Sequence, residues 1–96
     1  MPERTVTVAS TSGLHARPAA LFVKAAAAQP VPVKLRIGDG PLADARSILA
    51  VLALRVEHGT TVTLSTGAQD GPAAHEALEA LADLLSRDLD AQPADD

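Results

Sequence analysis

Hydrophobic and polar residues alternate along three stretches of the chain, and this period of two predicts strands with one buried face. The stretches are "RTVTVA" (residues 4–9), "VPVKLRI" (31–37) and "TTVTLST" (60–66). The side chains expected on the buried faces are Val6, Val8, Val31, Val33, Leu35, Ile37, Val62 and Leu64. A sheet with one wet and one dry face is typically antiparallel, so we expect helices to cover the dry face.

A further short strand is expected after the second of these stretches. Asp39-Gly40 is a hairpin signal and should return the chain through residues 41–43. The sheet is therefore expected to have four strands.

Three helices are expected, at about residues 16–28, 46–54 and 71–89. In the third, apolar side chains recur at helical spacing, with Asp70 as the N-cap and Pro72 in the first turn. Its core-facing positions are Ala74, Leu78, Leu81 and Leu85, and its water-facing positions are Glu76, Glu79 and Asp83. The order βαββαβα predicts an α+β fold with the helices packed on one side of an antiparallel sheet.

Composition and charge narrow the class of protein. The 96 residues suffice for one domain, expected over residues 1–89, followed by a frayed acidic tail, "DAQPADD" (residues 90–96). The chain has no cysteine and no long apolar run, so we expect a cytoplasmic protein without membrane insertion. We also expect it to be a monomer. Phe22 is the only aromatic residue, which excludes base stacking and argues against nucleic-acid binding.

Charge is unevenly distributed along the chain. Residues 1–69 carry a balance of +3 and residues 70–96 a balance of −7, within a net charge of −4. The acidic end is interpreted as a solvated helix face and tail, and the first part as a mildly basic surface that suits an acidic partner.

The candidate reactive residue is His15, in the stretch "STSGLHARPAAL" (residues 10–21). This stretch places His15 at or next to the N-cap of the first helix. Unpaired N–H groups and aligned peptide dipoles at a helix start attract anions and disfavour a charged imidazole, so a neutral, nucleophilic ring is expected. Arg17 can direct its guanidinium at phosphate oxygens, and Pro18 pre-sets the helical φ. These features predict that His15 takes up a phosphoryl group and passes it on.

The source of the phosphoryl group is expected to be another phosphoprotein, because the chain contains no nucleotide-binding motif. Protein donors and acceptors require a docking surface. The second helix, "RSILAVLAL" (residues 46–54), has apolar residues on nearly every face, so part of it is expected to be exposed, with Val51 and Leu54 in the core.

The motif "GLHARPAALFVK" (residues 13–24) and the order of elements resemble the HPr family, the histidine-containing phosphocarriers of the bacterial sugar phosphotransferase system. The resemblance covers residues 4–89. It implies an open-faced β-sandwich, a four-stranded antiparallel sheet under three helices. It also implies a carrier without a cofactor that forms a phosphohistidine intermediate, rather than an enzyme with its own small-molecule substrate.

The resemblance also implies roles for individual residues. Nδ1 of His15 would accept the phosphoryl group from phosphorylated Enzyme I and pass it to the A domains of sugar-specific Enzyme II proteins. Arg17 would assist the transfer, Pro18 would be structural, and Ser12 and the amides of Ala16 and Arg17 would lie near the phosphate. The docking residues would be Ala20, Lys24, Ile48, Leu49 and Leu52. Ser47 matches a serine that a dedicated ATP-dependent kinase phosphorylates in some members, although by position it is most simply an N-cap or first-turn residue.

One departure from the family pattern lies near this site. The family usually has glycine directly after the leucine that corresponds to Leu54, whereas this chain continues with Arg55 and Val56. If this position needs a positive φ, Arg55 costs about 1 kcal/mol relative to glycine, and its side chain enters the neighbourhood of the active centre. His58 and His75 are expected to be solvated, and the three histidines lack the spacing of a metal site.

Two other functions remain open. One is a relay of the same chemistry that feeds regulatory or nitrogen-linked partners and moves no sugar. The other is a non-catalytic module that binds a regulator, such as a transcriptional regulator, through the second helix and needs no His15.

Overall fold

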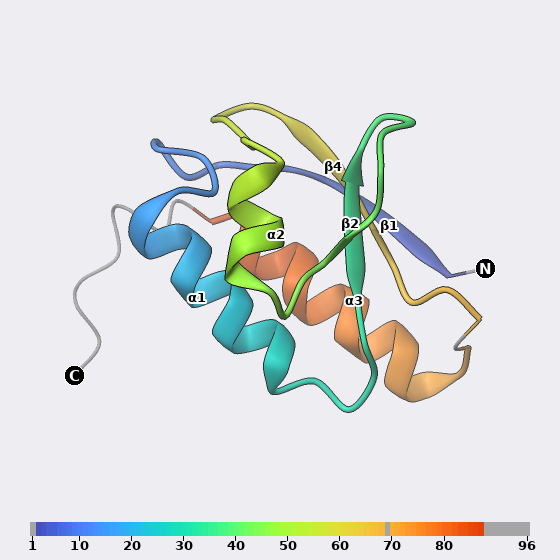
Figure 1. Cartoon of the computed structure of the whole chain (residues 1–96). Helices are drawn as coiled ribbons and strands as arrows, with labels where there is room; N and C mark the ends of the chain where they lie inside the picture. Colours follow the sequence, from blue (N-terminus) through green and yellow to red (C-terminus); the bar gives the residue numbers. More distant parts are fainter. Residues whose placement is uncertain (1, 69, 88–96) are drawn as a thin grey trace.

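The computed structural model describes residues 2–68 and 70–87, which fold in the predicted order βαββαβα (Figure 1). The strands are β1 (Glu3–Thr7), β2 (Lys34–Ile37), β3 (Ala43–Asp44) and β4 (Thr61–Ser65). The helices are α1 (Ala16–Ala27), α2 (Ile48–Ala53) and α3 (Pro72–Leu85). The expected end of the domain at residue 89 and the expected tail at 90–96 lie outside the described residues.

The four strands form one antiparallel sheet in the order β1-β4-β2-β3. The three helices lie together on one face of this sheet (Figure 1). Helix α3 packs against β1 and β4, and α1 contacts both α2 and α3. The predicted open-faced β-sandwich is therefore confirmed.

The core lies between the sheet and the helices. The alternating strand residues supply buried side chains as predicted, namely Val8, Val33, Leu35, Val62 and Leu64, with Val6, Val31 and Ile37 half-buried. The predicted inner face of α3 is also buried, at Ala74, Leu78, Leu81 and Leu85. The acidic residues expected on the opposite face of α3 are exposed, at Glu76, Glu79 and Asp83.

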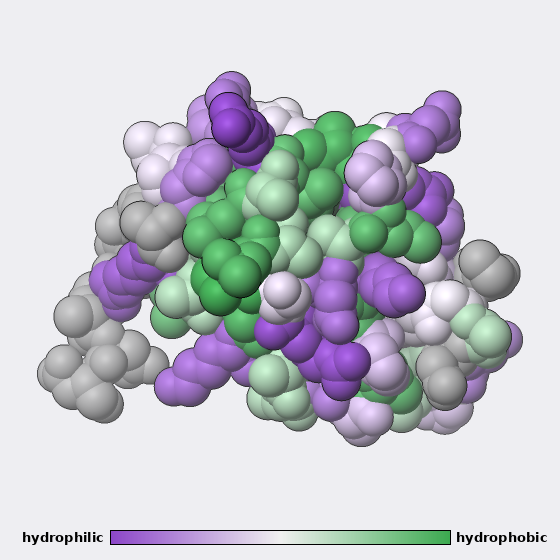
Figure 2. All heavy atoms as spheres, in the orientation of Figure 1, coloured by the Kyte–Doolittle hydropathy of each residue, from purple (hydrophilic) through white to green (hydrophobic). Residues whose placement is uncertain are grey.

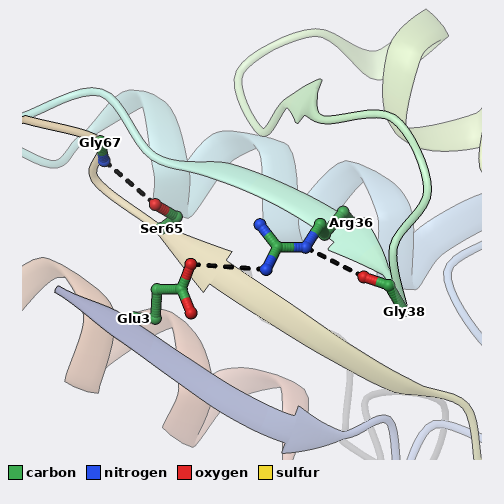
Figure 3. Close-up of polar contacts among 5 residues, drawn as sticks. All are labelled: Glu3, Arg36, Gly38, Ser65 and Gly67. Carbon is green, nitrogen blue, oxygen red and sulfur yellow. Dashed lines mark hydrogen bonds and ion pairs between the residues drawn. The ribbon is translucent and has the colours of Figure 1, made fainter. Parts of the chain in front are cut away.

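The open face of the sheet is polar, and its charged side chains pair across strands (Figure 3). Nε of Arg36 donates a 2.9 Å hydrogen bond to the carbonyl oxygen of Gly38, and the same guanidinium lies 3.5 Å from the carboxylate of Glu3. At the end of β4, the N–H of Gly67 donates to the hydroxyl oxygen of Ser65 (3.1 Å). These contacts stabilise the sheet on the side away from the helices.

The hairpin between β2 and β3 differs from the prediction. The short third strand predicted near residues 41–43 is present, but β3 spans Ala43–Asp44, so it lies slightly further along the chain. The turn is closed by a hydrogen bond from the N–H of Gly40 to the carbonyl oxygen of Ile37 (2.9 Å), and its positive φ of 54° is at Gly38. The left-handed residue of the turn therefore comes before Asp39-Gly40, and the hairpin pairs one residue further along the chain.

Helix α2 starts two residues later than predicted. The carboxylate of Asp44 accepts a hydrogen bond from the backbone N–H of Arg46 (2.9 Å), which favours a turn over residues 44–46. Ser47 then has extended backbone angles, φ −106° and ψ 112°, and acts as the N-cap. Residues 46 and 47 are therefore outside the helix.

The predicted N-cap of α3, Asp70, is wrong. Gly71 holds this position with a φ of 114°, and Pro72 follows at the start of the helix as predicted. The carboxylate of Asp70 accepts from the N–H of Gly71 (2.7 Å) instead of capping the first turn. The helix ends at Leu85 with Ser86 as its C-cap, so the predicted helix is wrong at residues 86 and 87, while residues 88 and 89 lie outside the described residues.

Candidate functional site

His15 is the N-cap of α1, as predicted. Its backbone is extended (φ −127°, ψ 160°), its side chain is half-buried, and it makes no capping hydrogen bond to the helix. The imidazole therefore sits at the partially positive end of a 12-residue helix without being used to hold that helix.

Buried neighbours on both sides hold His15 in place. Leu14 is fully buried immediately before it. Pro18 is buried in the first helical turn, where its missing N–H removes only a donor that the helix leaves unpaired, and Ala19 and Phe22 are fully buried further along.

The other face of α1 is exposed at Arg17, Ala20 and Lys24, and Ser12 is exposed in the preceding loop. Ala16 is the first residue of the helix.

The loop before His15 runs alongside residues 56–60 in antiparallel fashion. The N–H of Val8 donates to the carbonyl oxygen of Thr60 (2.9 Å), and further on the N–H of Leu14 donates to the carbonyl oxygen of Val56 (2.9 Å). We call residues 8–14 the active-site loop and residues 55–60 the supporting loop. The position of His15 therefore depends on a segment far away in the sequence.

Gly13 lies at the closest approach of these two loops. Its φ is 68°, and a β-carbon added there would lie 2.2 Å from the carbonyl oxygen of Val56 and 2.7 Å from Cα of Glu57. No side chain fits in that space. This role of Gly13 cannot be predicted from the sequence around it, because the contact is between residues distant in the sequence.

His58 also connects the two loops. Its side chain was predicted to be solvated, and it is exposed, yet Nδ1 lies 3.2 Å from the carbonyl oxygen of Ser10. The expected exposure of His58 is therefore confirmed, and its ring makes in addition a contact that the sequence did not predict. His75, by contrast, is exposed on α3, and its Nε2 lies 3.3 Å from the carboxylate of Asp70.

The end of α3 holds the active-site loop from another side. The N–H of Ala9 donates to the carbonyl oxygen of Leu85 (3.0 Å), and the hydroxyl of Ser10 donates to the carbonyl oxygen of Arg87 (3.4 Å). The loop is therefore held by two separate segments of the chain.

Helix α2 presents an apolar surface, as predicted in part. Leu49 is 77% exposed and Ile48 39% exposed, whereas Val51 is fully buried. Leu52 and Leu54 are both half-buried against the core, so the assignments of Leu52 as an exposed residue and Leu54 as a core residue hold only in part. Apolar side chains gather on the surface over α2 in Figure 2. Ile48 and Leu49 are the exposed apolar patch of this helix.

Ser47 caps α2, which confirms the simpler of its two interpretations. Its hydroxyl oxygen accepts a hydrogen bond from the N–H of Ala50 (3.2 Å). The side chain is half-buried, next to Ile48. Asp44 lies three residues before Ser47. A hydrogen bond from the backbone N–H of Arg46 is the main cause that lowers the pKa of the Asp44 carboxyl, and the guanidinium of Arg46 lowers this pKa further.

Arg55 adopts the left-handed conformation considered in the sequence analysis. Its φ is 54°, and its N–H donates to the carbonyl oxygen of Leu52 (3.1 Å) just after α2 ends. No other non-glycine residue in the described part of the chain has a positive φ.

Within residues 2–68 and 70–87, no three histidine, aspartate or glutamate side chains gather as a metal site. None of the helices described there is long and apolar enough to span a membrane.

Residues 2–87 match the family model described as "PTS HPr component phosphorylation site". The chain belongs to the HPr family. It is 45% identical over 93 residues to the phosphocarrier protein HPr of Streptomyces coelicolor, covering 97% of each chain. It is 46% identical over 85 residues to the phosphocarrier protein HPr of Haloferax volcanii, covering 88% of this chain and 92% of the relative.

A solved HPr structure has the same fold. The crystal structure of a phosphocarrier protein HPr from Bacillus anthracis superposes with a TM-score of 0.78 at 37% identity, covering 88% of this chain and 95% of that chain. Membership in the HPr family gives the chain a phosphocarrier role in the phosphotransferase system.

Proposed function

We propose that His15 accepts a phosphoryl group from phosphorylated Enzyme I and passes it to the A domains of sugar-specific Enzyme II proteins. The observation that carries this proposal is the place of His15 at the start of α1, where its ring makes no capping hydrogen bond. His58 and His75 lie in a loop and on the flank of α3, and both contact other groups. They lack the environment of His15.

The transfer itself exchanges one bond to phosphorus for another. The lone pair of the imidazole Nδ1 of His15 attacks phosphorus, and the bond from phosphorus to the donor atom breaks with its electron pair left on the donor. The reverse exchange passes the group to the acceptor. Charge on the phosphoryl oxygens is stabilised by the first amides of α1 and by Arg17, which is exposed on the first turn.

The stabilisation at this site is modest, which suits a carrier. A helix start contributes about 0.3 to 1 kcal/mol to the binding of an anion at an exposed site. A deeper, fully enclosed phosphate site would hold the group too strongly for onward transfer. His15 is only half-buried and so remains accessible to both partners.

Docking of both partners is proposed to use the exposed apolar patch of α2 together with the outer face of α1. Leu49 and Ile48 supply apolar contact area, and Ala20 and Lys24 are exposed on α1, which contacts α2. Leu52 contributes from its half-buried position. An acidic partner surface with an apolar centre fits this combination.

Regulation through Ser47 is proposed as a second use of the same surface. A phosphate on this residue would bring about −1.5 to −2 charges next to Ile48 and Leu49. The helix start and the adjacent Arg46 tolerate that charge within the domain, whereas an acidic partner would be repelled. This use requires a serine kinase in the same cell.

A pulse-chase experiment tests the proposed transfer. The protein is phosphorylated with Enzyme I and labelled phosphoenolpyruvate, Enzyme I is removed, and an Enzyme II A domain is added. The label is expected to move to the A domain, and a His15→Ala protein should carry none. A wild-type protein that takes up label but retains it in the presence of A domains would favour the relay to other partners. Regulator binding that persists in His15→Ala would favour the non-catalytic module.

A further inference from the structure

Arg55 has a backbone conformation that its side chain disfavours. It follows the C-cap of α2 with a φ of 54°, in a position where the absence of a β-carbon makes glycine the common choice. The conformation is fixed by the hydrogen bond from its N–H to Leu52 and by the pairing of Val56, the next residue, with Leu14. An arginine is therefore retained where the local backbone favours glycine, and such strain points to a use for the side chain.

The hydrogen bond from the N–H of Leu14 to the carbonyl oxygen of Val56 brings the neighbouring residues, His15 and Arg55, into the same part of the molecule. The contacts between the loops descend in antiparallel order, first Val8 with Thr60, then Ser10 with His58, then Leu14 with Val56. His15 follows Leu14, and Arg55 precedes Val56. The two chains run in opposite directions at the hydrogen bond between Leu14 and Val56, so His15 and Arg55 lie on the same side of that bond.

The side chain of Arg55 is available for an anion. The residue is exposed, and its guanidinium makes no hydrogen bond or ion pair with any residue in the described ranges. Other arginines of the chain are already paired with carboxylates, Arg4 with Glu79 and Arg46 with Asp44. Arg55 is thus an exposed cation with no partner among the described residues, and it adjoins the residue that accepts the hydrogen bond from Leu14.

We propose that Arg55 is a second phosphoryl-binding residue, which acts at His15 together with the first turn of α1. Its guanidinium binds phosphoryl oxygens while the bond from phosphorus to the donor breaks and the bond to His15 forms, with the leaving electron pair kept by the donor and no proton consumed. This assignment rests on the proposed function of His15. In this assignment Arg55 binds the phosphoryl group in addition to Arg17, and it is not part of the surface that docks the partner proteins.

The test compares variants of Arg55 by both stability and transfer kinetics. In Arg55→Gly the strain is relieved, so the melting temperature is expected to rise by about 4 to 8 °C. The maximal rate of phosphoryl transfer from Enzyme I, at saturating carrier, is expected to fall about tenfold because the cation is lost. Arg55→Asn, which tolerates a positive φ without a charge, should show the same loss of rate, and Arg55→Lys should retain most of it.

Lys34→Ala is the control for net charge, because Lys34 is an exposed cation on β2 within the sheet and away from His15. It should transfer at the wild-type rate. An unchanged maximal rate in Arg55→Gly, or a change confined to the Michaelis constant for the carrier, would overturn the assignment, and the latter would place Arg55 in partner docking. A wild-type protein that takes up no phosphoryl group would overturn the proposed function of His15 instead, and the role of Arg55 with it.

Discussion

Gly13 and Val56 are in direct backbone contact, since a β-carbon at Gly13 would lie 2.2 Å from the carbonyl oxygen of Val56. The N–H of Leu14 donates to that same oxygen. Residues far apart in sequence thereby fix the loop that ends in His15. The active centre is consequently sensitive to changes in the supporting loop that do not touch the imidazole.

Gly13→Ala is expected to destabilise the protein by about 1 to 3 kcal/mol and to slow phosphorylation of His15, because the added methyl group displaces one of the two loops. Chemical denaturation and transfer kinetics measure the two effects. Gly67→Ala is the matched control. Gly67 has a similar φ of 64° with nothing within 4 Å of an added β-carbon, so it should cost stability alone. Equal transfer rates in the two variants would show that the contact with Val56 does not position His15.

His58→Ala is expected to slow transfer without unfolding the domain, because it removes the contact between Nδ1 and the carbonyl oxygen of Ser10. Loss of one partly buried hydrogen bond should cost only about 0.5 to 1.5 kcal/mol. His58→Asn carries an amide donor close to the position of Nδ1 and should restore the rate. If His58→Asn and His58→Ala are equally slow, the effect comes from ring packing rather than from the hydrogen bond.

Leu49→Glu is expected to weaken binding to Enzyme I with little change in melting temperature, because Leu49 is 77% exposed. The same substitution at Val51, two residues along the same helix and fully buried, should destabilise the domain by several kcal/mol, on the order of 3 or more, since it buries an unpaired charge. Binding is measured by calorimetry, and stability by thermal unfolding. A collapse of the melting temperature in Leu49→Glu would assign Leu49 to the core.

Ser47→Asp is expected to raise the Michaelis constant of Enzyme I for the carrier while the fold stays stable. Aspartate is also a good N-cap, so it can replace the hydroxyl that accepts from Ala50, whereas Ser47→Ala loses this cap at a cost of about 1 kcal/mol. The kinetics are measured at low salt, where repulsion from an acidic partner is least screened. Normal kinetics for Ser47→Asp would mean that Ser47 is only a capping residue.

Asp44 is expected to make stability depend weakly on acid pH. Hydrogen bonding from Arg46 lowers the pKa of Asp44 in the folded protein, so the carboxylate stabilises the fold above its ordinary pKa and this contribution is lost as the pH falls through the lowered value. The group is largely exposed, so the effect should be about 0.5 kcal/mol or less. Asp44→Asn should be less stable than wild type at pH 7, and thermal unfolding should show the gap closing in acid, as the carboxylate of Asp44 becomes protonated. A gap that persists there would have a cause other than charge.

Arg17→Ala is expected to slow transfer and leave the circular-dichroism spectrum of the folded domain unchanged. Arg17 is exposed on the first turn of α1, and an exposed arginine contributes little to stability. Loss of the folded spectrum in this variant would make Arg17 a structural residue.

The hydrophobic pattern was sufficient to predict the order of elements and the core. The alternating pattern correctly predicted that Val62 and Leu64 are buried, and the helical pattern of residues 74–85 correctly predicted the buried face of α3. Both patterns can be recognised because they are local in the sequence. Errors were confined to boundaries, where single hydrogen bonds decide the outcome. The turn at Asp44 delayed the start of α2, and the left-handed Gly71 took the cap that Asp70 was expected to supply.

The active centre was only half predictable from the sequence. His15, Arg17 and Pro18 lie within four consecutive residues, in a pattern typical of a helix start. Local sequence rules are therefore sufficient to place them at the start of α1. The contributions of Gly13 and His58 depend on contacts between the active-site loop and the supporting loop, which no local pattern contains. For Arg55, the departure from glycine can be recognised in the sequence, whereas its positive φ and the hydrogen bond between Leu14 and Val56 next to it are seen only in the structure.

The most direct test of the account is the site of labelling when the protein is incubated with Enzyme I and labelled phosphoenolpyruvate. Peptide mapping by mass spectrometry under alkaline conditions, which preserve a bond between phosphorus and nitrogen, is expected to find one acid-labile phosphoryl group on His15 and none on His58 or His75. The His15→Ala protein should remain unlabelled. Comparable label on His58 or His75, or full labelling of His15→Ala, would contradict the assignment of His15 as the phosphoryl-accepting residue.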